Sequence, residues 1–246
     1  MKKILFALAA LTVSTLSAAS AGMEPDDHTI AFWDFSMQKQ GQIEDQSGFG
    51  NTAALQSMEN APLPKILPEE GAVFDGKGGY VQIQVKDSLK IRKGDFSIEV
   101  VFKCASEELL KRPSGFFLIG NKSHTEKISG FLLGYSPWQG RKFCFQYALD
   151  GKARSFNAPL KKPLETGKWY LLRISRKGDK LSCLLDNQLL AEEKVQGEIS
   201  LVNMRAARIG IYPAPWQRDK QNRLIVNGFE GTLRFIRFSD IGRDGK

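Results

Sequence analysis

The chain has 246 residues and carries a formal net charge of +8 at neutral pH. A moderate positive charge favours anionic partners, such as acidic polysaccharides or the phosphate-rich surface of a cell envelope. The basic residues are scattered in pairs and form no long run, which argues against a nucleic-acid-binding protein.

Three cysteines, Cys104, Cys144 and Cys183, are too few for a disulfide scaffold and lack the spacing of metal ligands. At most one disulfide could form among them, and burial as small apolar side chains in a sheet is the favoured interpretation. Because only His28 and His124 are available as imidazole ligands, we expect no zinc site.

Residues 1–21 have the pattern of a secretory signal peptide. Lys2 and Lys3 precede an apolar run, and Ala19-Ser20-Ala21 offers a cleavage site before Gly22. A disordered tail or a membrane anchor is the alternative, but the run is too short to span a bilayer permanently. We therefore expect an exported protein, periplasmic or secreted, whose mature chain has no transmembrane segment.

The rest of the chain consists of short β-segments separated by turns. In residues 80–85 and 96–104 every second residue is apolar, which is typical of a strand with one face on a core. Val81, Ile83 and Val85 form the inward face of the first segment. The expected strands, in chain order, are residues 30–35, 72–74, 80–85, 96–102, 116–119, 131–135, 142–149, 153–156, 169–175, 181–185, 207–211 and 229–238.

Other local signals agree with this pattern. Residues 107–111 hint at one short helix, and Asp150-Gly151 predicts a tight hairpin between two strands. No linker and no fixed repeat divides the chain. We therefore predict a single all-β domain over residues 22–246, built as a two-sheet antiparallel sandwich or jelly roll.

The last expected strand changes its inward parity. Leu233 and Phe235 share one face, whereas Ile236 and Phe238 share the other. Such a change predicts either a β-bulge between the two pairs or a strand that is buried on both faces.

Six motifs occur in an order that resembles a known family. They are Phe32-Trp33-Asp34-Phe35 with the turn at residues 45–51, the hairpin-like segment of residues 71–81, the strand at residues 96–102, Gly167-Lys168-Trp169-Tyr170, the strand at residues 181–186, and Ile209-Gly210 with residues 229–233. Together they resemble a LamG-like domain of the concanavalin A-like lectin/glucanase superfamily, over nearly all of the mature chain. The resemblance implies two antiparallel sheets in a jelly roll. Trp33 and Trp169 lie in apolar strands and are expected in the core.

The turn at residues 45–51 is a candidate calcium site. Asp45, Ser47, Gly48 and Asn51 make it rich in oxygen ligands, which Ca²⁺ prefers. In domains that this chain resembles, an Asp of the last strand completes such a structural calcium site, but Arg234 occupies that position here. Two alternatives follow: an Asx turn in which Asp45 binds its own backbone, and an ion pair between Arg234 and Asp45 that replaces the metal.

Two loops share a short sequence pattern and are the candidate ligand-binding site. Each follows an expected strand and places a Trp after a Pro, then a Gln and a basic residue. A Trp ring can cover the apolar face of a sugar, while Gln and Arg bond to its hydroxyl groups. The alternative is that each Trp folds back to cover a sheet edge or the end of the core. The candidate residues are Trp138, Gln139 and Arg141 in the first loop, and Trp216, Gln217 and Arg218 in the second.

The sequence offers no recognisable catalytic motif. Glucanases of the superfamily use an E-x-D-x-x-E strand, whereas the most similar strand here, residues 96–102, has Glu99 alone between apolar residues. No G-x-S-x-G motif is present. We therefore expect a non-catalytic carbohydrate-binding module. An envelope domain that binds a protein partner is the alternative, and a glycoside hydrolase or polysaccharide lyase is less favoured.

Overall fold

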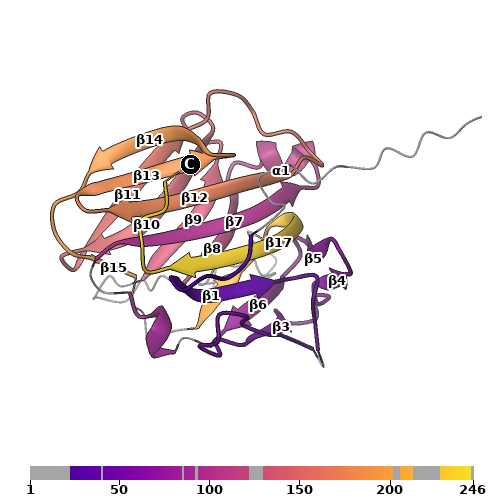
Figure 1. The fold of residues 1–246 in the computed structure, drawn as a ribbon. Coiled ribbons are helices and arrows are strands. Elements are labelled where there is room, and N and C mark those ends of the chain that lie inside the picture. Colours follow the sequence, from indigo (N-terminus) through magenta and orange to yellow (C-terminus); the bar gives the residue numbers. More distant parts are fainter. Residues whose placement is uncertain are drawn as a thin grey trace, which may run out of the picture.

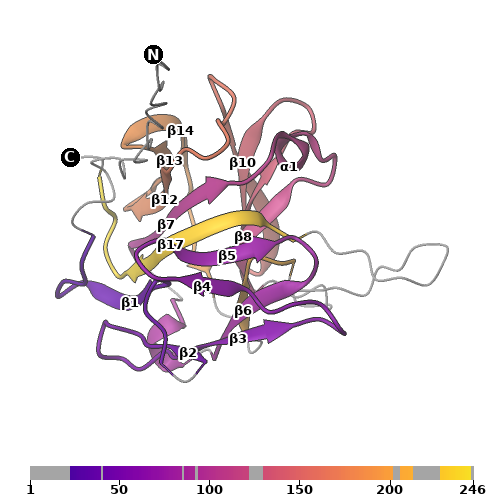
Figure 2. The ribbon, with the colours of Figure 1, turned by 90° about the vertical axis from the view of Figure 1, so that its right-hand side faces the viewer.

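The computed structural model describes residues 23–39, 41–84, 86–91, 94–121, 130–201, 206–212 and 228–244. Within these residues the chain forms two antiparallel β-sheets that pack face to face, as the sequence predicted. Figure 1 looks onto the first sheet, with β14 at the top and β1 and β4 below, while the second sheet lies behind it. Figure 2 shows the two layers from the side.

The first sheet, sheet A, has the strand order β14-β13-β12-β7-β17-β5-β4, and β1 also pairs with β17. Its strands are β14 (Gln188–Lys194), β13 (Lys180–Leu185), β12 (Tyr170–Lys177), β7 (Phe96–Cys104), β17 (Glu230–Ser239), β5 (Gly71–Asp75), β4 (Lys65–Leu67) and β1 (Thr29–Asp34). β5 pairs with the first part of β17 and β1 with its second part.

The second sheet, sheet B, has the order β11-β10-β9-β8-β16-β6-β3-β2, and β15 also pairs with β10. Its strands are β11 (Lys152–Pro159), β10 (Lys142–Leu149), β9 (Phe131–Ser136), β8 (Phe116–Gly120), β16 (Ala207–Ile209), β6 (Gly79–Ile83), β3 (Ala53–Ser57), β2 (Gln42–Ile43) and β15 (Ile199–Ser200). A 3-10 helix, η1 (Asp87–Leu89), and one α-helix, α1 (Glu107–Lys111), complete the described elements.

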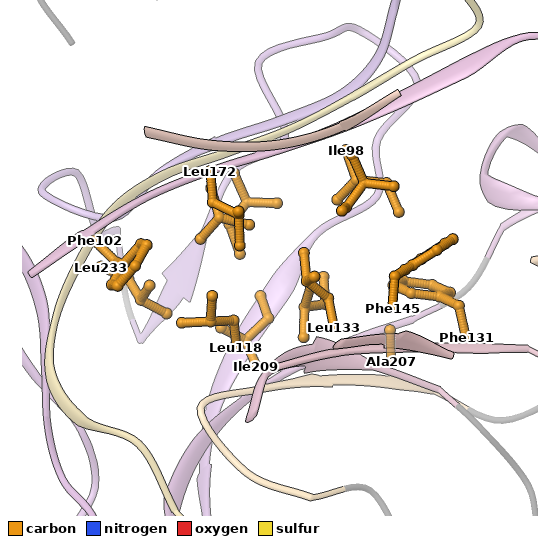
Figure 3. Close-up of a cluster of buried hydrophobic side chains, with 14 of the residues drawn as sticks. Ile98, Phe102, Leu118, Phe131, Leu133, Phe145, Leu172, Ala207, Ile209 and Leu233 are labelled. Atoms are coloured by element: carbon orange, nitrogen blue, oxygen red, sulfur yellow. The ribbon is translucent and has the colours of Figure 1, made fainter. Parts of the chain in front are cut away.

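The core lies between the two sheets because each strand turns alternate apolar side chains inward. Figure 3 shows Ile98, Phe102, Leu172 and Leu233 of sheet A facing Leu118, Leu133, Phe145 and Ile209 of sheet B. All five alternating apolar residues of β7 are fully buried, as predicted. Val81 and Ile83 are buried too, whereas Val85 lies outside the described residues.

Phe102 is the aromatic centre of this core. Its ring centroid lies 5.8 Å from that of Tyr170, 6.1 Å from Phe143, 6.3 Å from Phe229 and 6.5 Å from Phe116. These partners come from both sheets and from the residue before β17. Aromatic pairs at such distances stabilise a fold beyond the burial of their apolar surface, so this cluster holds the two sheets together at one end.

The parity change in β17 has both of the predicted causes, a β-bulge and burial on both faces of the strand. The register between β17 and β7 shifts between Leu233 and Phe235, so a bulge at Arg234 returns Ile236 and Phe238 to the inner face with Leu233. Phe235 instead faces outward, where it is also buried. It belongs to a second cluster on the outer face of sheet A, formed by Met23, Phe32, Val101, Trp169, Leu171 and Phe235.

The two predicted tryptophan anchors are both buried, but in different clusters. Trp33 lies in the main core, and its indole N–H donates to the backbone oxygen of Asn51 at 2.7 Å. Trp169 lies in the outer cluster, where the Lys103 ammonium sits 4.7 Å from its ring centroid. The outer face of sheet A is therefore partly apolar, and Met23 packs into its apolar cluster.

Local sequence signals predicted the short helix and one hairpin correctly, but the hairpin expected at residues 71–81 is wrong. Helix α1 spans the five predicted residues, and the Ser106 hydroxyl caps it by accepting a hydrogen bond from the Leu109 N–H at 3.2 Å. The β10–β11 hairpin turns at Asp150-Gly151, both with positive φ, as predicted. Residues 71–81 are not a hairpin, because β5 and β6 belong to different sheets and the chain crosses between the layers at residues 76–78.

The three cysteines are free thiols. Cys104 and Cys183 are buried in the core, which agrees with their prediction as small apolar side chains. Burial raises the pKa of the Cys104 thiol to about 12, so it stays protonated at neutral pH. Cys144 is only partly buried, and its thiol contacts the amide oxygen of Asn157 at 3.2 Å.

Candidate functional site

The predicted metal turn at residues 45–51 is an Asx turn held by one carboxylate. Asp45 Oδ1 accepts the backbone N–H of Phe32 at 2.9 Å and of Ser47 at 3.0 Å. Its Oδ2 accepts the backbone N–H and the side-chain amide of Asn51, at 2.8 and 2.7 Å. Gly48 adopts φ +87°, a conformation that suits glycine. The Asx-turn alternative is confirmed.

These bonds also set the charge of Asp45. Burial raises the pKa of this carboxyl. Hydrogen bonds from the Ser47 hydroxyl and from three backbone N–H groups together lower it by more, so the pKa lies below its ordinary value. Each carboxylate oxygen accepts two N–H donors. The amide oxygen of Asn51 accepts a hydrogen bond from Ser88 at 2.8 Å. The Asp45 carboxylate thus ties the turn to β1 and to Asn51 through N–H donors.

The predicted ion pair between Arg234 and Asp45 is wrong. Arg234 lies next to Asp34 instead, with its Nη2 3.4 Å from Asp34 Oδ2, and its guanidinium sits 4.8 Å from the ring of Phe235. The reason is the bulge in β17, which turns Arg234 toward the neighbouring strand β1. Among the described residues, no group of three His, Cys, Asp or Glu side chains could hold a metal ion.

A melting scan in EDTA and in calcium tests the calcium site that the sequence suggested. Because the carboxylate of Asp45 is filled by N–H donors, we expect the same melting temperature in EDTA and in millimolar CaCl₂. An Asp45→Ala variant serves as the comparison and should melt at a lower temperature under both conditions, since it leaves four donors without their acceptor. A melting temperature that rises with calcium in the wild type alone would establish a metal site at this turn.

The first candidate loop is a tight hairpin between β9 and β10. The Trp138 N–H donates to the Ser136 hydroxyl at 3.2 Å, and Gln139 and Gly140 adopt positive φ values of 54° and 96°. This turn leaves the Trp138 side chain 67% exposed, so it does not cover a sheet edge. The hairpin therefore presents an aromatic ring to solvent on a well-defined backbone.

Arg141 ends the same loop and lines a hollow of about 710 Å³. The hollow lies between α1, the β9–β10 hairpin and the segment that leads from β11 to β12. It is lined by Glu107, Leu110, Lys111, Tyr135, Arg141, Lys162, Pro163, Leu164, Glu165 and Thr166. Its volume falls within the range of about 300–1,000 Å³ typical of sites for small molecules.

Charged groups surround this hollow. Glu107 pairs with Lys111 across one turn of α1, at 3.4 Å. Tyr135 forms part of the wall, and its hydroxyl donates to the backbone oxygen of Leu110 at 3.3 Å. Burial raises the pKa of Tyr135 while the neighbouring Arg141 cation lowers it, with burial the larger effect. The tyrosine therefore stays neutral at physiological pH and acts as a packing residue.

The second candidate loop, with Trp216, Gln217 and Arg218, lies outside the described residues. Tyr212, which precedes it, packs with its ring centroid 4.9 Å from that of Phe117. The sequence did not single out Lys111, Lys162 or Glu165 as site residues. The signal that could have found one of them is the basic pair Lys161-Lys162, which has no apolar periodicity to place it in the core.

Glu99, the lone acid among the apolar residues of β7, is fully buried on the outer face of sheet A. Its Oε1 accepts Arg173 Nε at 2.8 Å, and its Oε2 accepts Arg237 Nε at 2.6 Å. Arg243 Nε lies 3.7 Å away. Both carboxylate oxygens are thus bound by guanidinium groups, so this residue acts in the structure and not as a general acid or nucleophile.

The described part of the chain is thus an antiparallel β-sandwich with a polar hollow at one end. No helix among its described residues is both long and apolar enough to cross a membrane. No protein-family model matches the chain, and no curated protein matches its sequence.

Several solved structures share its fold. The ligand-binding domain of botulinum neurotoxin serotype D, solved in complex with N-acetylneuraminic acid, superposes with a TM-score of 0.63 at 15% identity, over 89% of this chain and 49% of that one. The binding domain of Paraclostridial Mosquitocidal Protein 1 gives a TM-score of 0.59 at 10% identity, over 89% of this chain and 50% of that one. This chain therefore corresponds to about half the length of these domains, and at such identities the similarity shows the β-sandwich fold alone.

Proposed function

We propose that this chain is an exported, non-catalytic carbohydrate-binding module of the LamG-like, concanavalin A-like type. Its ligand is a poly- or oligosaccharide held at the end of the sandwich that carries Trp138, Gln139 and Arg141. One observation carries this proposal: the hairpin that exposes Trp138 also contributes Arg141 to the hollow of about 710 Å³. The complex of a structurally similar toxin domain with N-acetylneuraminic acid supports the ligand class.

The chemistry of a sugar suits this arrangement. A pyranose ring has an apolar face of C–H groups, which an exposed indole can cover, and a rim of hydroxyl groups. The guanidinium of Arg141 has five N–H donors, and the Gln139 amide adds donors and an acceptor. Because the hairpin turn fixes their backbone, these groups lose little conformational freedom when a ligand binds.

The proposal is tested on a glycan array followed by calorimetry with the glycans that bind. We expect Trp138→Ala and Arg141→Gln each to weaken binding about five- to thirtyfold, since a lost stacking or charged contact costs about 1–2 kcal/mol. Phe49→Ala is the matched control, because Phe49 is an exposed aromatic residue of another turn, at 53% exposure, and should leave binding unchanged.

Two results would contradict the proposal. Unaltered glycan binding by both hairpin variants would remove this site. Failure of the wild type to bind any glycan would instead favour the alternative function, an envelope domain with a protein partner.

Export and domain organisation form part of the same proposal. Residues 1–21 act as a cleaved signal peptide, residues 22–246 form one domain, and the mature protein is periplasmic or secreted. Mass spectrometry of the mature N-terminus after expression in a bacterial host tests this directly. We expect the chain to start at Gly22.

A further inference from the structure

A second hollow lies next to the first, on the other side of the segment that joins β11 to β12. We name this segment, residues 160–168, the strap. The second hollow measures about 310 Å³ and is lined by residues of the strap, by Tyr170 and by the β13–β14 turn. Lys162, Pro163, Leu164 and Glu165 line both hollows. The two hollows are therefore adjacent and share one wall.

The strap is fixed to the sandwich at several points. The Leu160 N–H donates to the Arg141 carbonyl at 2.8 Å, and the Glu165 N–H donates to the Tyr170 hydroxyl at 2.8 Å. The Gly167 N–H donates to the Cys104 carbonyl at 2.9 Å. The Leu164 side chain is buried in the main core. A wall held in this way is already formed before a ligand arrives, which lowers the entropic cost of binding.

Cations dominate the lining of the paired hollows. They contain Lys111, Arg141, Lys161, Lys162 and Lys168, against the carboxylates Glu107, Glu165 and Asp186. Each of these carboxylates is already engaged: Glu107 with Lys111 at 3.4 Å, Glu165 with Lys168 at 3.2 Å, and Asp186 with the Leu171 N–H at 2.9 Å. Within the described residues, Arg141, Lys161 and Lys162 have no carboxylate partner.

The second hollow also has an apolar side. Leu160, Pro163, Leu185, Leu189 and Leu190 contribute to its lining, and Leu189 is 50% exposed. Aliphatic side chains of this kind can cover the C–H faces of sugar rings. Tyr170 is the one aromatic residue of this lining, and the Lys168 ammonium lies 5.2 Å from its ring centroid, so the hollow has no series of aromatic platforms on which single-stranded nucleic acids stack their bases. A ligand that suits this lining combines C–H surface with repeated negative charge.

We infer that the two hollows are consecutive subsites of one groove for an extended anionic polysaccharide, with carboxylate or sulfate groups placed against Arg141, Lys161 and Lys162. This inference rests on the proposed function and adds the ligand class and the length of its binding site. α1, which borders the first subsite, and the β13–β14 hairpin, which borders the second, both lie in the upper part of the molecule in Figure 1. Because residues 162–165 line both hollows, a single polysaccharide chain can extend from one hollow into the other.

The inference predicts that affinity depends on both charge and length. Calorimetry with the mature protein compares hexagalacturonate, digalacturonate and the neutral cellohexaose, and a heparin hexasaccharide extends the test to sulfate. We expect the anionic hexasaccharides to bind at least about tenfold more tightly than digalacturonate and than cellohexaose. The affinity should fall as NaCl rises from 50 to 200 mM, because the contacts are exposed ion pairs that salt screens.

Variants of the second subsite make the test specific. Lys161 lines only the second hollow, so Lys161→Gln should weaken hexagalacturonate binding about three- to fivefold and leave digalacturonate binding nearly unchanged. Lys180→Gln is the matched control, since Lys180 is an exposed lysine of β13 that lines neither hollow and pairs with Glu192 at 3.2 Å.

The outcomes separate this inference from the proposed function. Equal affinities for hexagalacturonate and cellohexaose, or equal affinities for the dimer and the hexamer, would overturn the inference while Trp138→Ala still reports on glycan binding. Equally tight binding of polyglutamate would also overturn it, because it would show a site for acidic polypeptide. If the wild type binds no glycan at all, both the inference and the proposed function are overturned.

Discussion

Replacing Glu99 with alanine will lower the free energy of unfolding by about 3–5 kcal/mol, the cost of breaking a buried ion pair from one side. Glu99 is fully buried at the centre of sheet A, and its cross-strand neighbours on β12 and β17 are Arg173 and Arg237. Both arginines are about nine-tenths buried. Without the carboxylate, two guanidinium groups would remain in a poorly solvated site with no counter-charge.

Chemical denaturation followed by tryptophan fluorescence measures this loss. A triple variant, Glu99→Leu with Arg173→Met and Arg237→Met, should recover most of the stability, because it removes the buried charges together. Glu192→Ala is the surface control: its exposed ion pair with Lys180 should contribute no more than about 1 kcal/mol. If Glu99→Ala were no more destabilising than Glu192→Ala, the buried network would not stabilise the fold.

Replacing Phe102 with alanine will lower the free energy of unfolding by a similar amount, about 3–5 kcal/mol. The loss comes from the apolar surface that is no longer buried and from the cavity left behind. Phe102 is fully buried and lies within 6.5 Å of four aromatic rings, measured between ring centroids. Those partners lie on both sides of the sandwich. The cavity would therefore separate the two sheets where their aromatic side chains meet.

A conservative variant calibrates this effect. Phe102→Leu should cost only about 1–2 kcal/mol, since leucine fills much of the same volume. Phe49→Ala, at a residue that is 53% exposed, should change the free energy of unfolding by no more than about 0.5 kcal/mol. If the Phe102→Ala and Phe49→Ala variants unfold at the same urea concentration, the aromatic centre is not a major source of stability.

The central strands were predictable from sequence because their apolar residues alternate along the chain. β7 and β10 combine alternating apolar residues with clear turn signals, and β10 begins and ends where the sequence placed it. β14, by contrast, was missed. It is an edge strand of sheet A, and its side chains are exposed or only partly buried, so no alternation marks it. β2 and β15 are two residues long and carry no pattern.

The candidate site was predictable only in part. Trp138 and Arg141 stand out in the sequence because they follow a Pro in a short loop, and the structure places Trp138 in solvent and Arg141 at a hollow. The other walls of that hollow come from α1 and from the strap, which are separated from the hairpin by some 20 residues or more. No local pattern relates these segments, so the sequence did not bring them together.

The sequence by itself determined the sandwich, because the alternation of apolar residues is a local property that decides which side of each strand is buried. Only the tertiary structure decided the ionic partners. Arg234 lies beside Asp34 and not Asp45, and Glu99 lies between two arginines, because strand order and register place them there. Register is set by contacts between distant parts of the chain, and a charge carries no periodic signal of the partner it will meet.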